Sequence, residues 1–306
     1  MKIAIVGSGA LGSLLAALFS KAKADVLLFG RNKSRIENIS REGLSVEGAA
    51  GKWKARVKAS CVLEDISQAE LVILCVKSYD TKNVVSSFCG YLEKDTAVLS
   101  LQNGLGNVEV ISEAVPEERV IGGVTNIGAT LLEGAGVRYA GKGETVIGRA
   151  DGKVTAEMRP VRELFSSAGL ELKISRDIKN IIWSKLVLNA GINALSAVLR
   201  LPNGALVRSE GAKRIMRAAV TEAVRVAKRK KIKLVYDDPL AKAEAICEST
   251  AGNLSSMLQD ILGKRRSEID AINGAIIRIA QEAGIPVPVN IMLADMVKSI
   301  EENYSR

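Results

Sequence analysis

Residues 183–197, WSKLVLNAGINALSA, place one ammonium and two amides at intervals of four residues in an otherwise apolar segment. On a helix this spacing puts Lys185, Asn189 and Asn193 on one stripe. Exposure of the stripe to solvent would be the ordinary alternative, because most lysines lie at the surface. The neighbouring Ile, Leu, Val and Trp residues leave almost no wholly polar face, however. We therefore expect the stripe to face a cleft, where an ammonium can donate a proton.

The absence of histidine limits the chemistry that the other residues can perform. None of the 306 residues is a histidine, which excludes Ser-His-Asp and Cys-His nucleophiles and every histidine-ligated metal site. Four cysteines lack C-x-x-C spacing, so we expect neither a metal site nor a disulfide framework; they are Cys61, Cys75, Cys89 and Cys247. The proton donor of an enzyme with this sequence must be Lys, Glu, Asp, Tyr or Cys.

The segment GSGALG, residues 7–12, fits the dinucleotide-binding pattern G-x-G-x-x-G. It follows a strand-like run and opens a helical one, which is the context that the pattern requires. Gly7 allows the tight turn, Gly9 lets the backbone approach a pyrophosphate, and Gly12 lets the helix pack on the strand. The helix N-terminus would stabilise the phosphate charge. We predict that the dinucleotide is bound by Gly7, Ser8, Gly9, Ala10, Leu11 and Gly12.

The end of the second strand indicates which dinucleotide is bound. An NAD-dependent enzyme carries Asp or Glu at this position for the ribose hydroxyls. Here the sequence is FGRNKSR, with Arg31 at the strand end and Lys33 and Arg35 close behind it. A guanidinium can bind a 2′-phosphate through paired hydrogen bonds, whereas an acid would repel it. We therefore predict that Arg31 contacts the cofactor and that NADPH is preferred over NADH.

The net charge of +9 indicates an anionic partner of unspecified size. We expect no nucleic-acid partner, because only 4% of the residues are aromatic. The densest basic run, KRKK at 228–231, ends a helical pattern, where cations are favourable in any case. The strand-like run directly after Met1 and Lys2 leaves no room for a signal peptide, and no uninterrupted apolar run reaches the length of a membrane span. We expect a cytoplasmic protein with no membrane partner.

The first half of the chain alternates strand-like and helix-like segments, which is typical of a parallel sheet covered on both faces. Apolar strands are predicted at 3–7, 25–30, 71–76, 96–101 and 119–124, and helices at 10–22, 78–88 and 107–114. The runs VRYAG and ETVIG, 137–141 and 144–148, would form a hairpin that closes the sheet edge.

From residue 177 onward the strand signals vanish. Helical patterns cover 177–199, 209–231, 238–250, 268–283 and 288–302. The predicted fold class is therefore α/β: an N-terminal Rossmann-type, doubly wound parallel sheet over residues 1–175, followed by an all-helical domain over residues 176–306. One continuous domain is the alternative, and this change of pattern argues against it.

These motifs together resemble the ketopantoate reductase (2-dehydropantoate 2-reductase) family, nearly from end to end. The matching segments are GSGALG at 7–12, CVKSYDT at 75–81, LQNGLGN at 101–107, WSKLVLNAGINALSA at 183–197, LPNGAL at 201–206, and NLSSMLQD with SEIDAING between 253 and 274. The resemblance implies a 6-phosphogluconate-dehydrogenase-like two-domain fold and the NADPH-dependent reduction of ketopantoate to pantoate in pantothenate and coenzyme A biosynthesis. An all-helical second domain often supplies a dimer interface, so a homodimer is expected.

The resemblance also implies roles for individual residues. Lys185 would be the general acid that protonates the carbonyl oxygen as hydride arrives, and Glu268 would be a second catalytic residue that closes the site. The substrate would be bound by Lys185, Asn189, Asn193, Asn203, Asn103, Asn253, Ser255 and Ser256. Besides the glycine loop and Arg31, the cofactor would be contacted by Lys77, Asn103, Glu268 and, through its backbone, Ala129. An ammonium near the ketone oxygen agrees with this chemistry, because reduction places negative charge on that oxygen.

Some of these residues also have purely structural interpretations. Glu268 follows Ser267, which would be a suitable helix N-cap, and carboxylates are favourable in a first helical turn. Ser256 would pass for an ordinary cap or loop serine, and Lys77 for the polar end of a buried strand.

Two alternative functions remain open at this point. A reductase of a different 2-keto acid, or an opine-type dehydrogenase, would share the same framework. A catalytically silent NADPH-binding regulator would keep the glycine loop and Arg31. It would have no reason to keep Lys185, Asn189, Asn193 and Glu268.

Overall fold

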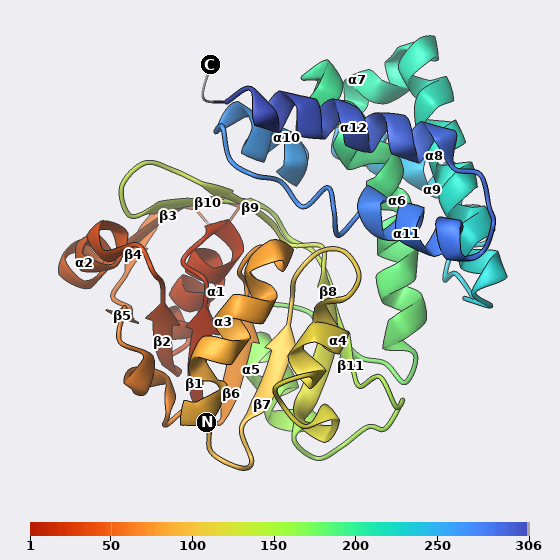
Figure 1. Cartoon of the computed structure of the whole chain (residues 1–306). Coiled ribbons are helices and arrows are strands. Elements are labelled where there is room, and N and C mark those ends of the chain that lie inside the picture. The colour runs from red at the N-terminus through yellow and green to blue at the C-terminus, as the bar shows by residue number, and fades with distance from the viewer. Residues whose placement is uncertain (50, 305–306) are drawn as a thin grey trace. The chain divides into compact units, whose positions relative to one another are not determined.

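The computed structural model describes residues 1–49 and 51–304, and their contacts divide the chain into two units (Figure 1). The first unit comprises residues 1–102 and 107–178, and the second comprises 103–106 and 179–306. This division falls after residue 178 rather than after residue 175. The loop 103–106, which we predicted for the first domain, groups with the second because the N–H of Leu105 donates to the carbonyl of Ala271 at 3.0 Å.

The first unit is built on an eight-stranded sheet with the order β12-β11-β8-β7-β6-β1-β2-β5. Its strands are β1 (Lys2–Val6), β2 (Asp25–Phe29), β5 (Lys58–Ser60), β6 (Leu71–Leu74), β7 (Ala97–Ser100), β8 (Val120–Thr125), β11 (Thr145–Gly148) and β12 (Leu172–Ile174). Six neighbouring strands of this sheet, β5, β2, β1, β6, β7 and β8, are parallel to one another, whereas β11 and β12 run in the opposite direction. In chain order the parallel part reads 3-2-1-4-5-6, which is the strand order of dinucleotide-binding sheets.

Helices cover both faces of this sheet, because its strands are apolar on both sides. Ile3 and Ile5 of β1 pack into a core with α1 (Ala10–Lys21) and α5 (Met158–Ser167). Ala4 and Val6, which alternate with them, pack into a second core with α3 (Thr81–Phe88) and α4 (Asn107–Ser112). The predicted doubly wound α/β class is therefore confirmed.

A second sheet of four strands, with the order β4-β3-β10-β9, packs against α1. It comprises β3 (Leu44–Gly48), β4 (Trp53–Ala55), β9 (Gly128–Leu131) and β10 (Gly136–Gly141). The hairpin predicted for 137–141 and 144–148 is wrong, because β10 belongs to this sheet and β11 to the other. The pairs β8–β11 and β9–β10 are instead one long hairpin that bends from sheet to sheet, and the N–H of Asn126 donates to the carbonyl of Glu144 at the bend (3.0 Å).

The remaining elements of the first unit are short connections. They are α2 (Lys33–Glu42) and the 3₁₀ helices η1 (Leu63–Ile66), η2 (Ser78–Asp80), η3 (Cys89–Tyr91) and η4 (Glu117–Arg119).

The described part of the second unit consists of helices joined by loops and contains no strand. Its helices are α6 (Ile178–Leu199), α7 (Asn203–Arg208), α8 (Glu210–Arg229), α9 (Pro239–Ser249), α10 (Ser256–Leu262), α11 (Asn273–Glu282) and α12 (Pro288–Glu302). Four of the five predicted helices have nearly the predicted bounds, whereas α11 begins at residue 273 instead of 268. The short helices α7 and α10 were not predicted, because fewer than eight residues show little periodicity.

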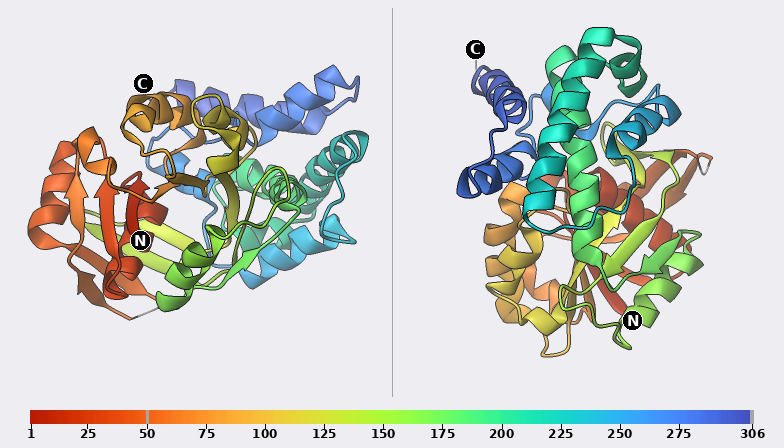
Figure 2. Two further views of the ribbon diagram at one scale, coloured as in Figure 1. Left: turned by 90° about the horizontal axis from the view of Figure 1, so that it is seen from below. Right: turned by 90° about the vertical axis from the view of Figure 1, so that its right-hand side faces the viewer.

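Helix α6 forms the centre of this unit and packs beside α8 (Figure 2). A Cβ at Gly191 would lie 2.5 Å from Val220 Cγ2 of α8, so glycine is required for this close approach. By length and composition α6 could cross a membrane, and 72% of its most apolar window is buried inside the protein. The sequence analysis predicted this helix, but it considered only uninterrupted apolar runs and so did not recognise the helix as long and apolar enough to span a membrane. Core helices of folded proteins pass the same test.

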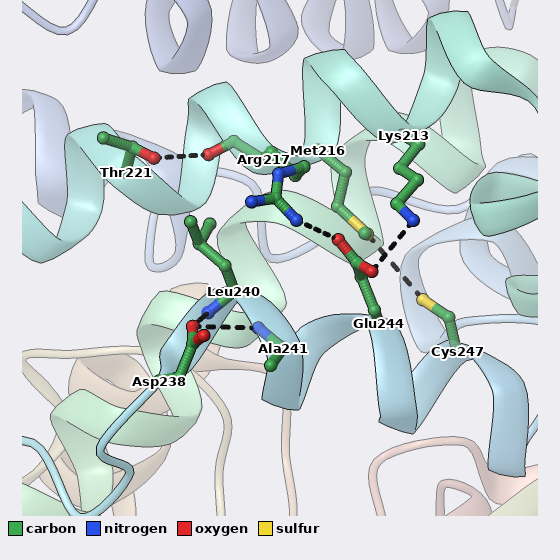
Figure 3. Close-up of polar contacts among 9 residues, drawn as sticks. All are labelled: Lys213, Met216, Arg217, Thr221, Asp238, Leu240, Ala241, Glu244 and Cys247. Atoms are coloured by element: carbon green, nitrogen blue, oxygen red, sulfur yellow. Dashed lines mark hydrogen bonds and ion pairs between the residues drawn. The ribbon is translucent and has the colours of Figure 1, made fainter.

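Polar contacts attach α9 to α8 (Figure 3). Glu244 of α9 forms ion pairs with Lys213, at 3.0 Å, and with Arg217. Asp238 caps α9 by accepting hydrogen bonds from the N–H groups of Leu240 and Ala241. The Asp238 cap explains why α9 begins where the sequence pattern predicts it.

Candidate active site

The glycine loop between β1 and α1 has the geometry that its motif requires. Gly7 has a φ of 118°, and its N–H donates to the carbonyl of Phe29 at 2.9 Å. A Cβ at Gly12 would lie 2.0 Å from the carbonyl oxygen of Gly7, whereas a Cβ at Gly9 would meet nothing within 4 Å. Gly7 and Gly12 are therefore needed for packing, and the space beside Gly9 is open to a ligand.

The start of α1 suits an anion. Gly9 is its N-cap and provides no side-chain cap, and the first turn, which begins with Ala10 and Leu11, contains no acidic residue. The first N–H groups of a helix lack intrahelical partners and attract negative charge. The open space and the uncapped helix end fit a dinucleotide pyrophosphate.

Arg31 and Arg35 differ in what they contact. The Arg31 side chain is 61% exposed and forms an ion pair with Asp80 at 2.9 Å. Arg35 is instead bound to the protein: its Nε donates to the carbonyl of Ser8 at 2.9 Å, and its Nη2 donates to Ser13 Oγ at 3.1 Å. Arg35 therefore supports the glycine loop, whereas the role of Arg31 toward a 2′-phosphate stays a prediction.

The other predicted cofactor residues of the first unit lie in different elements. Lys77 is the partly buried N-cap of η2, in the segment that connects β6 to this helix. Ala129 is a partly buried residue of β9, opposite Tyr139 of β10. Their predicted roles toward the cofactor stay predictions.

The second unit brings Lys185, Glu268 and Asn103 together. Burial lowers the pKa of Lys185 from 10.5 to about 8, and the nearby Glu268 carboxylate opposes this change. Glu268 is 6% exposed and accepts a hydrogen bond from Asn103 Nδ2 at 3.5 Å. A lysine with this pKa can hold or release a proton near neutrality, which suits a general acid.

Burial raises the pKa of Cys75 to about 12 and that of Cys247 to about 11, so neither thiol competes for this role.

Glu268 and Asn103 are positioned by turns rather than by helices. Glu268 lies in a turn before α11, where its carbonyl accepts hydrogen bonds from the N–H groups of Ala271 and Ile272. It is not a first-turn residue of the helix, so the capping interpretation of its carboxylate is wrong. Asn103 is held beside it because Gly104, with a φ of 88°, lies so close to Ala271 that a Cβ would be 2.5 Å from that carbonyl oxygen.

The stripe on α6 continues from Lys185 through Asn189, which is partly buried, to Asn193, which is 6% exposed. Ser196, one turn further along, donates to the carbonyl of Asn193 at 3.0 Å and hydrogen-bonds Ser255 Oγ at 2.5 Å. Ser255 is also the N-cap of α10, where it accepts from the N–H of Leu258. The stripe therefore runs from Lys185, which interacts electrostatically with Glu268, to a buried hydroxyl pair at the other end.

Asn203 and Asn253 are joined through the backbone, because the N–H of Asn203 donates to the carbonyl of Asn253 at 3.0 Å. The side chain of Asn203 donates to Thr250 Oγ1 at 2.8 Å, and its buried Oδ1 has no hydrogen-bond partner. Asn253 and Ser256 are exposed. A buried acceptor without a partner is costly, so Asn203 Oδ1 suits a ligand that brings a donor.

The sequence analysis missed a buried polar network behind the stripe. Asn273 Nδ2 donates to the carbonyl of Ala190 in α6 and to Asn290 Oδ1, both at 3.0 Å. Asn290 Nδ2 donates to the buried carboxylate of Glu222 at 2.8 Å. The only available signal was Glu222, an acid among the apolar residues that α8 repeats at helical spacing. The network fixes the start of α11, and hence the turn of Glu268, against α6.

Comparison with known proteins identifies the family. A sequence model described as ketopantoate reductase PanE/ApbA matches residues 3–152, and its C-terminal counterpart matches residues 177–301. A 2-dehydropantoate 2-reductase of Halobacterium salinarum is 37% identical over 301 residues, which cover 97% of this chain and 98% of the relative. The chain belongs to the ketopantoate reductase family.

Solved structures agree with this membership. A PanE/ApbA family ketopantoate reductase from Ralstonia eutropha matches with a TM-score of 0.92 at 34% identity and covers all of both chains. D-mandelate dehydrogenase, in a ternary structure with NADH and anilino(oxo)acetate, matches as well, with a TM-score of 0.93 at 27% identity over all of both chains. The ketopantoate reductase fold therefore also carries an enzyme named for a different 2-hydroxy acid.

Proposed function

We propose that the protein reduces 2-dehydropantoate (ketopantoate) to pantoate with NADPH, in pantothenate and coenzyme A biosynthesis. The observation that carries this proposal is the lysine with a lowered pKa beside Glu268 and Asn103, on a helix that also bears Asn189 and Asn193. Membership of the family supports the reaction class.

The first unit would hold the cofactor. The backbone of the glycine loop and the N-terminus of α1 would bind the pyrophosphate, and Arg31 would bind the 2′-phosphate. When bound, the nicotinamide supplies the hydride for the keto carbon. Lys77, Ala129, Asn103 and Glu268 are further proposed contacts.

Lys185 would act as the general acid. Reduction of a ketone develops negative charge on the carbonyl oxygen, and the Lys185 ammonium would stabilise this charge and donate the proton. Glu268 favours the protonated lysine at neutral pH, because its carboxylate raises the lysine pKa against the effect of burial. The pair would thus keep a proton available without a histidine.

Amide and hydroxyl groups would orient the substrate. Asn189 and Asn193 would hydrogen-bond the keto acid, and Asn253, Ser255 and Ser256 would lie around its carboxylate. Asn203 Oδ1, buried and without a partner, would accept a hydrogen bond from the substrate hydroxyl. A substrate that brings a hydroxyl would therefore be preferred over one that lacks it.

The second candidate is the reduction of a different 2-keto acid. The similarity to D-mandelate dehydrogenase favours this alternative, since that protein matches the chain over its full length. The apolar part of the substrate would then differ, while the roles of Lys185 and the asparagines would be the same.

The first experiment measures NADPH oxidation with ketopantoate, pyruvate, 2-oxoisovalerate, oxaloacetate and benzoylformate. For the wild type we expect turnover of ketopantoate well above the others. Lys185→Ala should lower kcat by about 10²- to 10⁴-fold while NADPH still binds. Turnover of another acid alone would select the second candidate, and NADPH binding without any turnover would indicate a regulator.

Two further properties are part of the proposal. The protein would be cytoplasmic and would form a homodimer. Light scattering of the purified chain tests the second statement, and a monomeric mass at micromolar concentration would contradict it.

A further inference from the structure

Arg31 and Asp80 form an ion pair at the carboxyl edge of the eight-stranded sheet. The Nη2 atom of Arg31 lies 2.9 Å from Asp80 Oδ2. Arg31 follows β2, and Asp80 ends η2, which follows β6. Since β2 and β6 are the neighbours of β1, the pair joins the two segments that flank the glycine loop.

Asp80 occupies the N-cap position of α3 but makes no capping hydrogen bond with its side chain. This is unusual, because aspartate is favoured at N-caps for that bond. The Asp80 side chain is only 25% exposed, whereas that of Arg31 is 61% exposed. The carboxylate is therefore engaged by Arg31 and not by the helix, and a guanidinium with five N–H donors can bind a second anion at the same time.

We propose that Asp80 is a specificity-determining residue that limits the preference for NADPH over NADH. This inference rests on the proposed function, in which Arg31 binds the 2′-phosphate. The Asp80 carboxylate repels a 2′-phosphate and neutralises part of the charge on Arg31. Toward NADH it can accept hydrogen bonds from the ribose hydroxyls, which is the role of the acidic residue in NAD-dependent enzymes. The ion pair thus serves both cofactors and favours the phosphate only moderately.

The test is the ratio of the Kd for NADH to the Kd for NADPH, measured by fluorescence titration of the full chain without substrate. We expect Asp80→Asn to raise this ratio about tenfold, because one negative charge leaves the vicinity of the phosphate dianion. Arg31→Gln should lower the ratio. In the Arg31→Gln background, Asp80→Asn should change this Kd ratio by a clearly different factor than it does in the wild type. The two residues act on the same phosphate group, so their effects should not be additive.

Asp25→Asn is the matched control. Asp25 begins β2, at the end of the strand opposite to Arg31, and forms an ion pair with Lys58 at 2.8 Å, so this variant also removes one carboxylate from an ion pair. The ratio of the Kd for NADH to the Kd for NADPH of this variant should equal that of the wild type.

An unchanged or lower ratio in both Asp80→Asn and Asp80→Ala would overturn the inference. Each cofactor is titrated into a separate portion of the same preparation. An unfolded fraction therefore raises both apparent Kd values by the same factor, and the ratio of the two Kd values does not depend on it. A wild-type chain that binds no NADPH would instead overturn the proposed function. The two failures are therefore distinguishable.

Discussion

The pKa of Lys185 makes the proposed general acid testable by pH. The ammonium must be protonated to act, so kcat/KM for reduction should fall as the pH rises through about 8. Glu268 raises the lysine pKa, so Glu268→Gln should move this fall to lower pH. Profiles of both proteins measured with the same buffers check the prediction. A fall at the same pH in both would mean that Glu268 does not act on Lys185.

The same lysine should cost the folded protein stability. Its pKa in the folded state is about 8 and its ordinary value is 10.5, so at pH 7 the fold carries an ammonium that burial disfavours. We expect Lys185→Met to raise the free energy of unfolding at pH 7 by about 1–3 kcal/mol while abolishing activity.

The pH dependence of this gain has a defined sign. Between pH 8 and 10.5 the unfolded chain keeps a proton that the folded chain has released, so the stability of the wild type rises with pH in this window. The gain in the free energy of unfolding that Lys185→Met brings should therefore be complete below pH 8 and vanish above pH 10.5. Urea unfolding at several pH values measures it. An advantage that is independent of pH would point to packing rather than charge.

At the level of single residues, spacing predicted the stripe but not its surroundings. Lys185, Asn189 and Asn193 share one helix, so their common face follows from the sequence alone. Glu268 and Asn103 reach that helix through turns far away in the chain, and no local pattern predicts such a meeting. Their selection depended on family resemblance.

Among the elements, the glycine loop allows packing to be separated from ligand binding. Gly12→Ala would put a Cβ 2.0 Å from the carbonyl oxygen of Gly7, so it should lower the melting temperature and weaken NADPH binding together. Gly9→Ala would meet nothing within 4 Å of its Cβ. It should leave the melting temperature unchanged and still weaken NADPH binding at least tenfold, since the methyl group would occupy space proposed for the pyrophosphate.

Melting curves and NADPH titrations of the two variants check this prediction, with Gly90→Ala as the control. Gly90 lies in η3, and a Cβ there also meets nothing within 4 Å. Normal NADPH affinity in Gly9→Ala would be evidence against the assignment of this loop to the pyrophosphate.

Element prediction succeeded where one periodicity dominates and failed where tertiary pairing decides. The buried parallel strands and the long helices carry strong patterns. The hairpin of 120–148 bends between two sheets, and its bend depends on pairing of Asn126 with Glu144, which is not visible in either segment alone. For a similar reason α11 begins at residue 273 instead of 268, because Glu268 lies in a non-helical turn.

For the molecule as a whole, the net charge of +9 should make cofactor capture depend on salt. Salt screens the attraction between a cationic protein and an anionic ligand, and NADPH carries about two more negative charges than NADH. The KM for NADPH should therefore rise several-fold from low to high ionic strength, more steeply than the KM for NADH, while kcat changes little. Initial rates in sodium chloride and in choline chloride measure both slopes and separate screening from effects of a particular cation. Equal slopes for the two cofactors would mean that neither the overall charge nor Arg31 acts on the 2′-phosphate.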